Sequence, residues 1–332
     1  MNGGAEKVMI NTYLSLKKKH NVACLLPKEN FIGKFIESKD VIEYASFVDA
    51  FRLIKKFNPE KIILNNKKTL KFLFLIKILS LDVKVYYHSH SYLRNLYEKI
   101  IYSFILSPLI FHTICVSNSL KLNHVGLLSK DKKHTTIYNG FNFDFVSDKK
   151  KQKPNQINVF FWAQLRKWKG HLFLLKVIKE YKFKNTIFHF VFSTQDEESA
   201  ETLKTIKKLA KEYNIEDLIK YYPNQENHLE FINHNANISL SCSRISDPLP
   251  TIIIESLAMG VPILSTNVGG SKEILREYPE LLADVSVNDF GSKLKLLIEN
   301  IDKYSPETLT KVAFNQYSLS RYKRNFLDLI DS

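Results

Sequence analysis

The sequence predicts an α/β protein made of two doubly wound domains. Apolar runs of strand length alternate with longer segments of helical period along the whole chain. The length of 332 residues, 45% of them hydrophobic, suffices for two such domains at roughly 150 residues each. Residues 148–156, charged and containing a proline, are typical of a linker between the halves.

Each half contributes five candidate strands in chain order. We therefore expect an N-terminal domain over 1–147, a linker over 148–156, a C-terminal domain over 157–316 and a final helix over 317–332. The candidate strands of the first half are Asn21–Leu26, Lys61–Leu64, Val83–Tyr87, Thr113–Val116 and Thr135–Tyr138. Those of the second half are Ile157–Trp162, Thr186–Phe192, Ile219–Tyr222, Asn237–Ser241 and Val261–Ser265.

The glycine turn at the start of the sequence, Gly3-Gly4-Ala5-Glu6, should follow a strand, because a βα unit opens in this way. Only two residues precede it. We expect that the first strand is missing, through truncation or a gene start placed late. No apolar leader is present, and the three cysteines form no C-x-x-C pair, so we expect a cytoplasmic protein with reduced thiols.

Positive charge is concentrated in the first half of the chain. Of the net +14, residues 1–150 carry +12 and residues 151–332 carry +2. This asymmetry indicates an anionic partner for one domain, which could be a nucleic acid, an acidic membrane surface or a phosphate-bearing substrate. A Lys-rich composition without a specific partner explains it equally well.

The basic segment 66–79 combines lysines with aromatic residues. On a helix, its four lysines share a face with Phe74 and Ile78, while Phe72, Ile76 and Leu79 point the opposite way. Such a face suits an anionic membrane surface. A core helix whose lysine stems cover apolar neighbours is the alternative. The lysines are Lys67, Lys68, Lys71 and Lys77.

Residues 243–262 carry the strongest chemical signal. Pro250 or Thr251 opens a helix that Gly260 ends, and the free N–H groups at its start favour an anion. Asp247 precedes this helix and Glu255 lies two turns along it, so the two acids can reach different parts of one extended ligand. The alternative is that Asp247 only caps the helix and Glu255 is solvated.

The order of motifs resembles family-4 glycosyltransferases (glycosyl transferases group 1), retaining enzymes of the GT-B fold with two facing Rossmann-like domains. The carrying residues are Asp247-x7-Glu255, then Ala-Met-Gly-Val-Pro-Ile and Val268-Gly-Gly-Ser-Lys-Glu273. Gly3-Gly4-Ala5-Glu6, His88-Ser89-His90, Tyr138-Asn139-Gly140 and Trp168-Lys169-Gly170-His171 occur in the family's order. The resemblance implies that the last helix crosses back onto the N-terminal domain.

The resemblance also implies a role for each matching residue. Asp247 would contact the transferred sugar, Glu255 the ribose hydroxyls, and Lys169 the diphosphate, whose negative charge grows as it departs. The donor sugar would face His90 or His88. The diphosphate would further lie against the main chain of Pro250, Thr251 and Ile252 and against Gly3 and Gly4.

Two departures from the family pattern affect the donor site. Gln164 stands where the family usually has an arginine, and Arg166 could reach the same phosphate oxygens. The usual glycine-rich turn after the second strand of the C-terminal domain is replaced by residues 192–196, so we expect a different base pocket.

The resemblance implies a retaining, metal-independent glycosyltransferase without a cofactor beyond its UDP- or GDP-linked sugar. The acceptor would be a glycan or a lipid-diphosphate-linked glycan in bacterial surface polysaccharide (capsule or O-antigen) assembly, at the inner face of the membrane. No metal site is expected, because His88 and His90 lack further ligands in the sequence. Alternatives are an epimerase or polymerase acting on nucleotide sugars and, with no motif in its favour, a nucleic-acid-binding protein.

Overall fold

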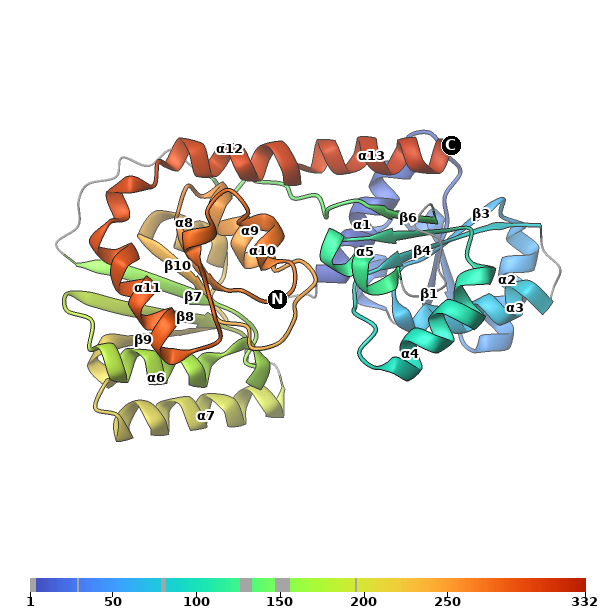
Figure 1. The fold of residues 1–332 in the computed structure, drawn as a ribbon. Helices are drawn as coiled ribbons and strands as arrows, with labels where there is room; N and C mark the ends of the chain where they lie inside the picture. Colours follow the sequence, from blue (N-terminus) through green and yellow to red (C-terminus); the bar gives the residue numbers. More distant parts are fainter. Residues whose placement is uncertain (1–3, 29, 79–81, 126–132, 147–155, 195) are drawn as a thin grey trace. The chain divides into compact units, whose positions relative to one another are not determined.

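The computed structural model describes residues 4–28, 30–78, 82–125, 133–146, 156–194 and 196–332 (Figure 1). The chain forms two compact units. The C-terminal unit is Asn142–Ser318, and the N-terminal unit is Asn2–Phe141 together with Leu319–Ser332. Both units contain parallel sheets between helices, so the predicted α/β fold class is confirmed.

The N-terminal unit contains two parallel sheets. Strands β1 (Cys24–Pro27) and β2 (Val41–Tyr44) pair with each other. The second sheet has the order β3-β4-β5-β6. Its strands are β3 (Lys61–Leu64), β4 (Lys84–Ser89), β5 (His112–Cys115) and β6 (His134–Thr136).

Three helices of the N-terminal unit, α2, α4 and α5, begin where a polar side chain caps free N–H groups. Ser46, Asn95 and Ser117 each accept a backbone hydrogen bond at the start of one of them. The helices are α1 (Gly4–Leu16), α2 (Phe47–Phe57), α3 (Phe72–Ile78), α4 (Leu96–Ile101), α5 (Asn118–His124) and α13 (Leu319–Asp331).

Helix α13 completes the core of this unit. Figure 1 shows it beside α1, although more than 300 residues separate the two helices in sequence. The buried Tyr322 and Phe326 pack in one cluster with Val8, Tyr86 and Ile114, and the hydroxyl groups of Thr12 and Tyr322 lie 2.6 Å apart. The last helix is thus part of the N-terminal unit.

The C-terminal unit has one six-stranded parallel sheet in the order β12-β11-β10-β7-β8-β9. Its strands are largely buried, as in parallel sheets covered on both faces, except for the partly exposed edge strand β9. They are β7 (Ile157–Trp162), β8 (Thr186–Phe192), β9 (Ile219–Pro223), β10 (Ile238–Ser241), β11 (Ile263–Thr266) and β12 (Leu282–Ala283).

The strand order reverses at β7, which has β8 on one side and β10 on the other. Ligands of doubly wound sheets bind at such a switch point, at the carboxyl ends of the strands. The helices of this unit are α6 (His171–Tyr181), α7 (Glu197–Glu212), α8 (His228–Asn235), α9 (Thr251–Ala258), α10 (Ser271–Ile274), α11 (Val287–Glu299) and α12 (Pro306–Tyr317). Among the described residues, no helix is both long and apolar enough to span a bilayer.

Candidate functional site

A partly buried ion pair lies at the carboxyl ends of β7 and β10. Lys169 ends the single 3-10 turn η7 (Lys167–Lys169) that follows β7, and Asp247 lies in the loop that follows β10. The Nζ atom of Lys169 lies 2.9 Å from Oδ2 of Asp247, and their side chains are 20% and 15% exposed. Nζ also lies 4.1 Å from the centroid of the Trp168 ring. Lys169, predicted to bind the diphosphate, and Asp247, predicted to bind the sugar, are therefore in direct contact.

The loops that carry this pair are held together through their backbones. Gly170 has φ +88°, and a Cβ atom there would lie 1.8 Å from the carbonyl oxygen of Cys242. Gly269 has φ +58°, and a Cβ atom there would lie 2.2 Å from the carbonyl oxygen of Asp247. The N–H of Gly270 donates to the carbonyl of Asp247 at 2.8 Å. Only glycine allows so close an approach with this backbone conformation.

The second predicted acid, Glu255, is buried rather than solvated, with 8% of its surface exposed. Its Oε2 atom accepts a hydrogen bond of 2.8 Å from Nε1 of Trp162, the last residue of β7. Trp162 is a site residue that the sequence did not single out, because its apolar ring fits the strand pattern equally well. Fixing one carboxylate oxygen through the indole orients the other.

Helix α9 begins at the expected place. Pro250 occupies the position before its first turn, followed by Thr251 and the buried Ile252. The first N–H groups of such a helix lack partners within the helix and favour an anion. The helix therefore offers N–H donors close in sequence to Asp247.

The side chain of Arg166 is paired with Asp196 and Glu198. Its guanidinium forms two hydrogen bonds with the carboxylate of Asp196, one of them Nη1 to Oδ1 at 3.0 Å, and lies 3.5 Å from Glu198. This bidentate pair lowers the pKa of Asp196, which also caps α7. Gln164 has an exposed side chain. The structure thus pairs the predicted phosphate-binding Arg166 with the acids at the start of α7.

A hollow of about 240 Å³ lies at the carboxyl ends of β8 and β9, next to β7 in the sheet. It falls where the sequence departs from the family pattern after β8. The hydroxyl of Ser193 is buried in its wall without a hydrogen-bond partner among the described residues. The lining residues are Val191, Phe192, Ser193, Asn224, Gln225, Glu226 and His228.

The two predicted histidines lie in the N-terminal unit. His88, in β4, is fully buried against Phe326, with its ring centroid 4.4 Å from that of His90. His90 directly follows the strand, is partly exposed, and has Nε2 3.4 Å from Oδ1 of Asn65. Burial lowers the pKa of His90 to about 4 and that of His88 well below its ordinary value. Of the two, only His90 reaches the surface at the carboxyl end of β4.

The predicted contact of the diphosphate with Gly3 and Gly4 falls at the beginning of the chain. Gly4 is the first residue of α1, and Gly3 lies outside the described residues. Within the part of the chain that the structure describes, no group of three or more His, Cys, Asp or Glu side chains could hold a metal ion.

Buried histidines should make folding sensitive to acid. Burial lowers the pKa of His171 to about 3 and those of His124 and His189 to about 4. Between pH 6.5 and 4 the unfolded chain binds protons that the folded chain does not, so stability falls as the pH falls. We expect urea unfolding to show a loss of about 2 kcal/mol per such histidine between pH 7.5 and pH 5.

The His171→Phe variant isolates one of these histidines. Both ring nitrogens of His171 lack hydrogen-bond partners among the described residues, and the ring packs against Phe161 and Phe190. The variant should therefore lose part of the pH dependence, whereas the exposed His234→Gln should not. The explanation is wrong if wild type and His171→Phe respond equally to pH.

The family model described as "Glycosyl transferases group 1" matches residues 142–311. An uncharacterized glycosyltransferase of Haemophilus influenzae is 30% identical over 147 residues, which are 43% of this chain and 39% of the relative's length. The match therefore spans well under half of that curated relative.

Solved structures of similar fold cover nearly the whole chain. A glycosyltransferase from Rickettsia africae is 18% identical with a TM-score of 0.82, covering 99% of this chain and 94% of the other. Anabaena HepE in complex with UDP and glucose is 14% identical with a TM-score of 0.82, at 99% and 96% coverage. The lipopolysaccharide outer core galactosyltransferase WaaB is 15% identical with the same TM-score and coverages. These similarities confirm the predicted GT-B fold.

Proposed function

This chain belongs to the glycosyl transferases group 1 family, and we propose that it is a retaining glycosyltransferase that takes its sugar from a nucleotide-sugar donor. The observation that carries the proposal is the contact between Lys169 and Asp247, the latter in the loop that leads into α9. A cation, a carboxylate and free helical N–H groups together match a sugar diphosphate, which presents hydroxyls next to anionic oxygens.

In this proposal Lys169 and the N–H groups around Pro250–Ile252 bind the diphosphate. They stabilise the charge that it gains as the glycosidic bond breaks. Asp247 accepts hydrogen bonds from the hydroxyls of the sugar, and Glu255, oriented by Trp162, accepts those of the ribose. The donor is a UDP-linked sugar, in line with the complex of HepE with UDP and glucose, and the hollow beside β8 receives the base.

The transfer itself is proposed to proceed on the front face of the sugar. The departing diphosphate oxygen takes the proton of the acceptor hydroxyl, so the protein supplies neither a nucleophile nor a metal or cofactor. Of the two predicted histidines, His90 is the proposed catalytic one. The partly exposed position of His90, in contrast to the buried His88, supports this choice.

The acceptor in this proposal is a glycan or a lipid-diphosphate-linked glycan of a bacterial surface polysaccharide, such as capsule or O-antigen. The similarity to a structure described as a lipopolysaccharide galactosyltransferase and the basic first half of the chain support this acceptor class. The enzyme would then work in the cytoplasm, at the inner face of the membrane.

Nucleotide binding tests the proposal most directly. By calorimetry, wild type should bind UDP about tenfold more tightly than 2′-deoxyuridine diphosphate, because the 2′-hydroxyl is proposed to donate a hydrogen bond to the largely desolvated carboxyl group of Glu255. Glu255→Gln should remove most of this difference. Trp162→Phe, which keeps an aromatic ring but loses the N–H donor, should reduce it less.

The matched control is Glu299→Gln, an exposed glutamate on α11 that should leave both affinities unchanged. A thermal-shift screen with UDP and GDP accompanies the calorimetry, since a ligand of the native state raises the melting temperature. If neither nucleotide stabilises the wild-type protein, the proposed donor site is wrong.

A further inference from the structure

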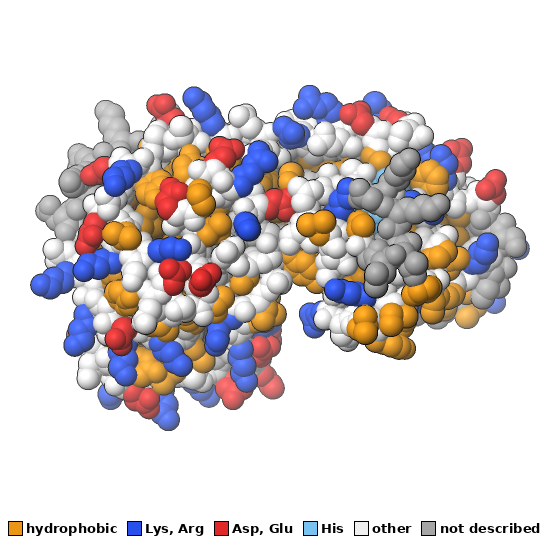
Figure 2. Space-filling model, viewed as in Figure 1, with side chains coloured by type: hydrophobic (Ala, Val, Ile, Leu, Met, Phe, Trp, Pro, Cys, Tyr) orange, Lys and Arg blue, Asp and Glu red, His pale blue; other side chains and the backbone are white. Residues whose placement is uncertain are grey.

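An exposed apolar ridge runs along the helical segment that follows β4. This segment comprises α4 and the π-helical turn η4 (Tyr102–Leu106). Leu96, Tyr97, Ile100 and Phe104 are 70%, 71%, 46% and 60% exposed, and at 100° per residue they fall within roughly 100° of one another. Figure 2 shows hydrophobic side chains gathered over this part of the N-terminal unit, beside Lys and Arg side chains. We call these four residues the α4 ridge.

The opposite side of the same segment is ordinary core. Tyr102 is fully buried and clusters with Leu73, Ile76 and Ile110. The segment is therefore anchored in the unit, and the α4 ridge is left without an apolar partner among the described residues. An exposed stripe of several large apolar side chains on a protein surface usually indicates an interaction site.

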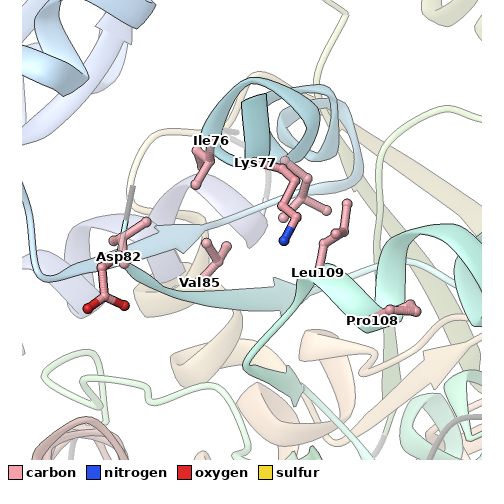
Figure 3. A pocket seen from close by; sticks show the side chains of 8 residues that line it. Ile76, Lys77, Asp82, Val85, Pro108 and Leu109 are labelled. Carbon is pink, nitrogen blue, oxygen red and sulfur yellow. The ribbon is translucent and has the colours of Figure 1, made fainter. Parts of the chain in front are cut away.

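The neighbouring segment, the 3-10 turn η3 (Lys67–Lys71) and α3, contacts the segment that carries the ridge. Lys67 bonds to Glu98 of α4, with Nζ 2.6 Å from Oε1, which places η3 against α4. A hollow of about 430 Å³ lies between α3 and the turn that follows η4, and in Figure 3 Lys77 of α3 extends toward Leu109. The two segments thus form one surface.

The charge of this surface is positive. Lys71 and Lys77 are exposed on one segment, Lys99 is exposed on the other, and Arg94 lies just before it. Of the acids, Glu98 is paired with Lys67, and Asp82 lines the hollow together with Lys77. The sequence predicted that Phe74 would share the lysine face of residues 66–79, with Phe72 and Ile76 opposite. In the structure Phe74 is 47% exposed, and Phe72 and Ile76 are buried. The side chain of Ile78 and residue Leu79 lie outside the described residues.

We infer that this surface docks on an anionic lipid bilayer, with the α4 ridge inserted among the lipid chains and the lysines over the headgroups. Large apolar and aromatic side chains bordered by Lys and Arg match the layered chemistry of such a bilayer. An acidic protein partner would match the lysines but not four exposed apolar side chains on one stripe. The inference deepens the proposed function and rests on it, because the proposed lipid-linked acceptor would be held in such a bilayer.

Vesicle co-sedimentation tests the inference without donor or acceptor, so that its outcome does not depend on the proposed reaction. Wild type should bind phosphatidylglycerol-containing vesicles and bind phosphatidylcholine vesicles at least tenfold more weakly. The triple variant Leu96→Ser, Ile100→Ser, Phe104→Ser should lose at least tenfold in affinity. These side chains are exposed, so folding should survive, which circular dichroism checks.

The matched control replaces exposed apolar residues of the C-terminal unit, Val285, Leu296 and Phe314, by serine and should bind as wild type does. Lys71→Glu with Lys77→Glu should weaken binding at low salt. The inference is overturned if the ridge variant binds like wild type or if wild type ignores anionic vesicles. It is equally overturned if the ridge variant only converts a dimer into a monomer, because the surface would then join two copies of the chain.

Discussion

Asp247→Asn should lower the rate of sugar transfer roughly 100-fold or more, while UDP affinity changes by less than about threefold. The substitution keeps the shape of the side chain and removes the charge that holds Lys169 at 2.9 Å. In the proposed site this carboxylate touches the sugar and not the nucleotide, so the loss should appear in turnover. Steady-state transfer or donor hydrolysis, together with calorimetry of UDP, measures the two quantities.

Lys169→Met should behave differently, although it breaks the same ion pair. Its loss should weaken UDP binding at least tenfold, because Lys169 is proposed to contact the diphosphate. The exposed Asp217→Asn serves as the control for a lost negative charge in the same unit. Full transfer activity in Asp247→Asn would contradict the assignment of Asp247.

Gly170→Ala should reduce the free energy of unfolding of the C-terminal unit by about 3 kcal/mol or more. The new Cβ atom would meet a carbonyl oxygen at 1.8 Å, and the residue already has φ +88°. The backbone must move, and Lys169 moves with it. Both tryptophans, Trp162 and Trp168, lie in this unit, so their fluorescence during urea unfolding reports on it specifically.

Gly33→Ala is the control for this experiment. A Cβ atom at Gly33 would find its nearest neighbours, in Leu26 and Val41, at 3.9 Å, which is ordinary contact. This variant should leave the tryptophan transition unchanged and overall stability within about 1 kcal/mol. Equal unfolding midpoints for Gly170→Ala and wild type would show that the loop accommodates the methyl group.

Most strands could be predicted from the sequence because buried strands consist mainly of apolar residues. Lys61–Leu64, Ile157–Trp162 and Thr186–Phe192 have the predicted bounds. The strands β2 and β12 were missed. The first is only partly buried and contains an acid, and the second has two residues, so neither produces a periodic apolar signal.

The residues of the candidate site could be predicted only where they are close in the sequence and have a characteristic spacing. Asp247 and Glu255 flank a helix start, and that pattern is visible in one dimension. The bond from Trp162 to Glu255 joins residues 93 positions apart, and the pairing of Arg166 with Asp196 depends on the length of two loops. Which side chains meet across such distances in the sequence depends on the register of neighbouring strands, and the amino-acid composition of a segment does not determine that register.

The packing of α13 on α1 has a consequence for the order of folding during synthesis. The core around Val8, Tyr86 and Ile114 is closed by Tyr322 and Phe326, which a ribosome translates only after the whole stretch Asn142–Ser318. The C-terminal unit, by contrast, is one continuous stretch, Asn142–Ser318, and has all its strands before the final helix is made. The N-terminal unit, whose synthesis begins first, therefore completes its core second, and a chain released before residue 319 contains the whole C-terminal unit but an N-terminal unit with an open apolar face.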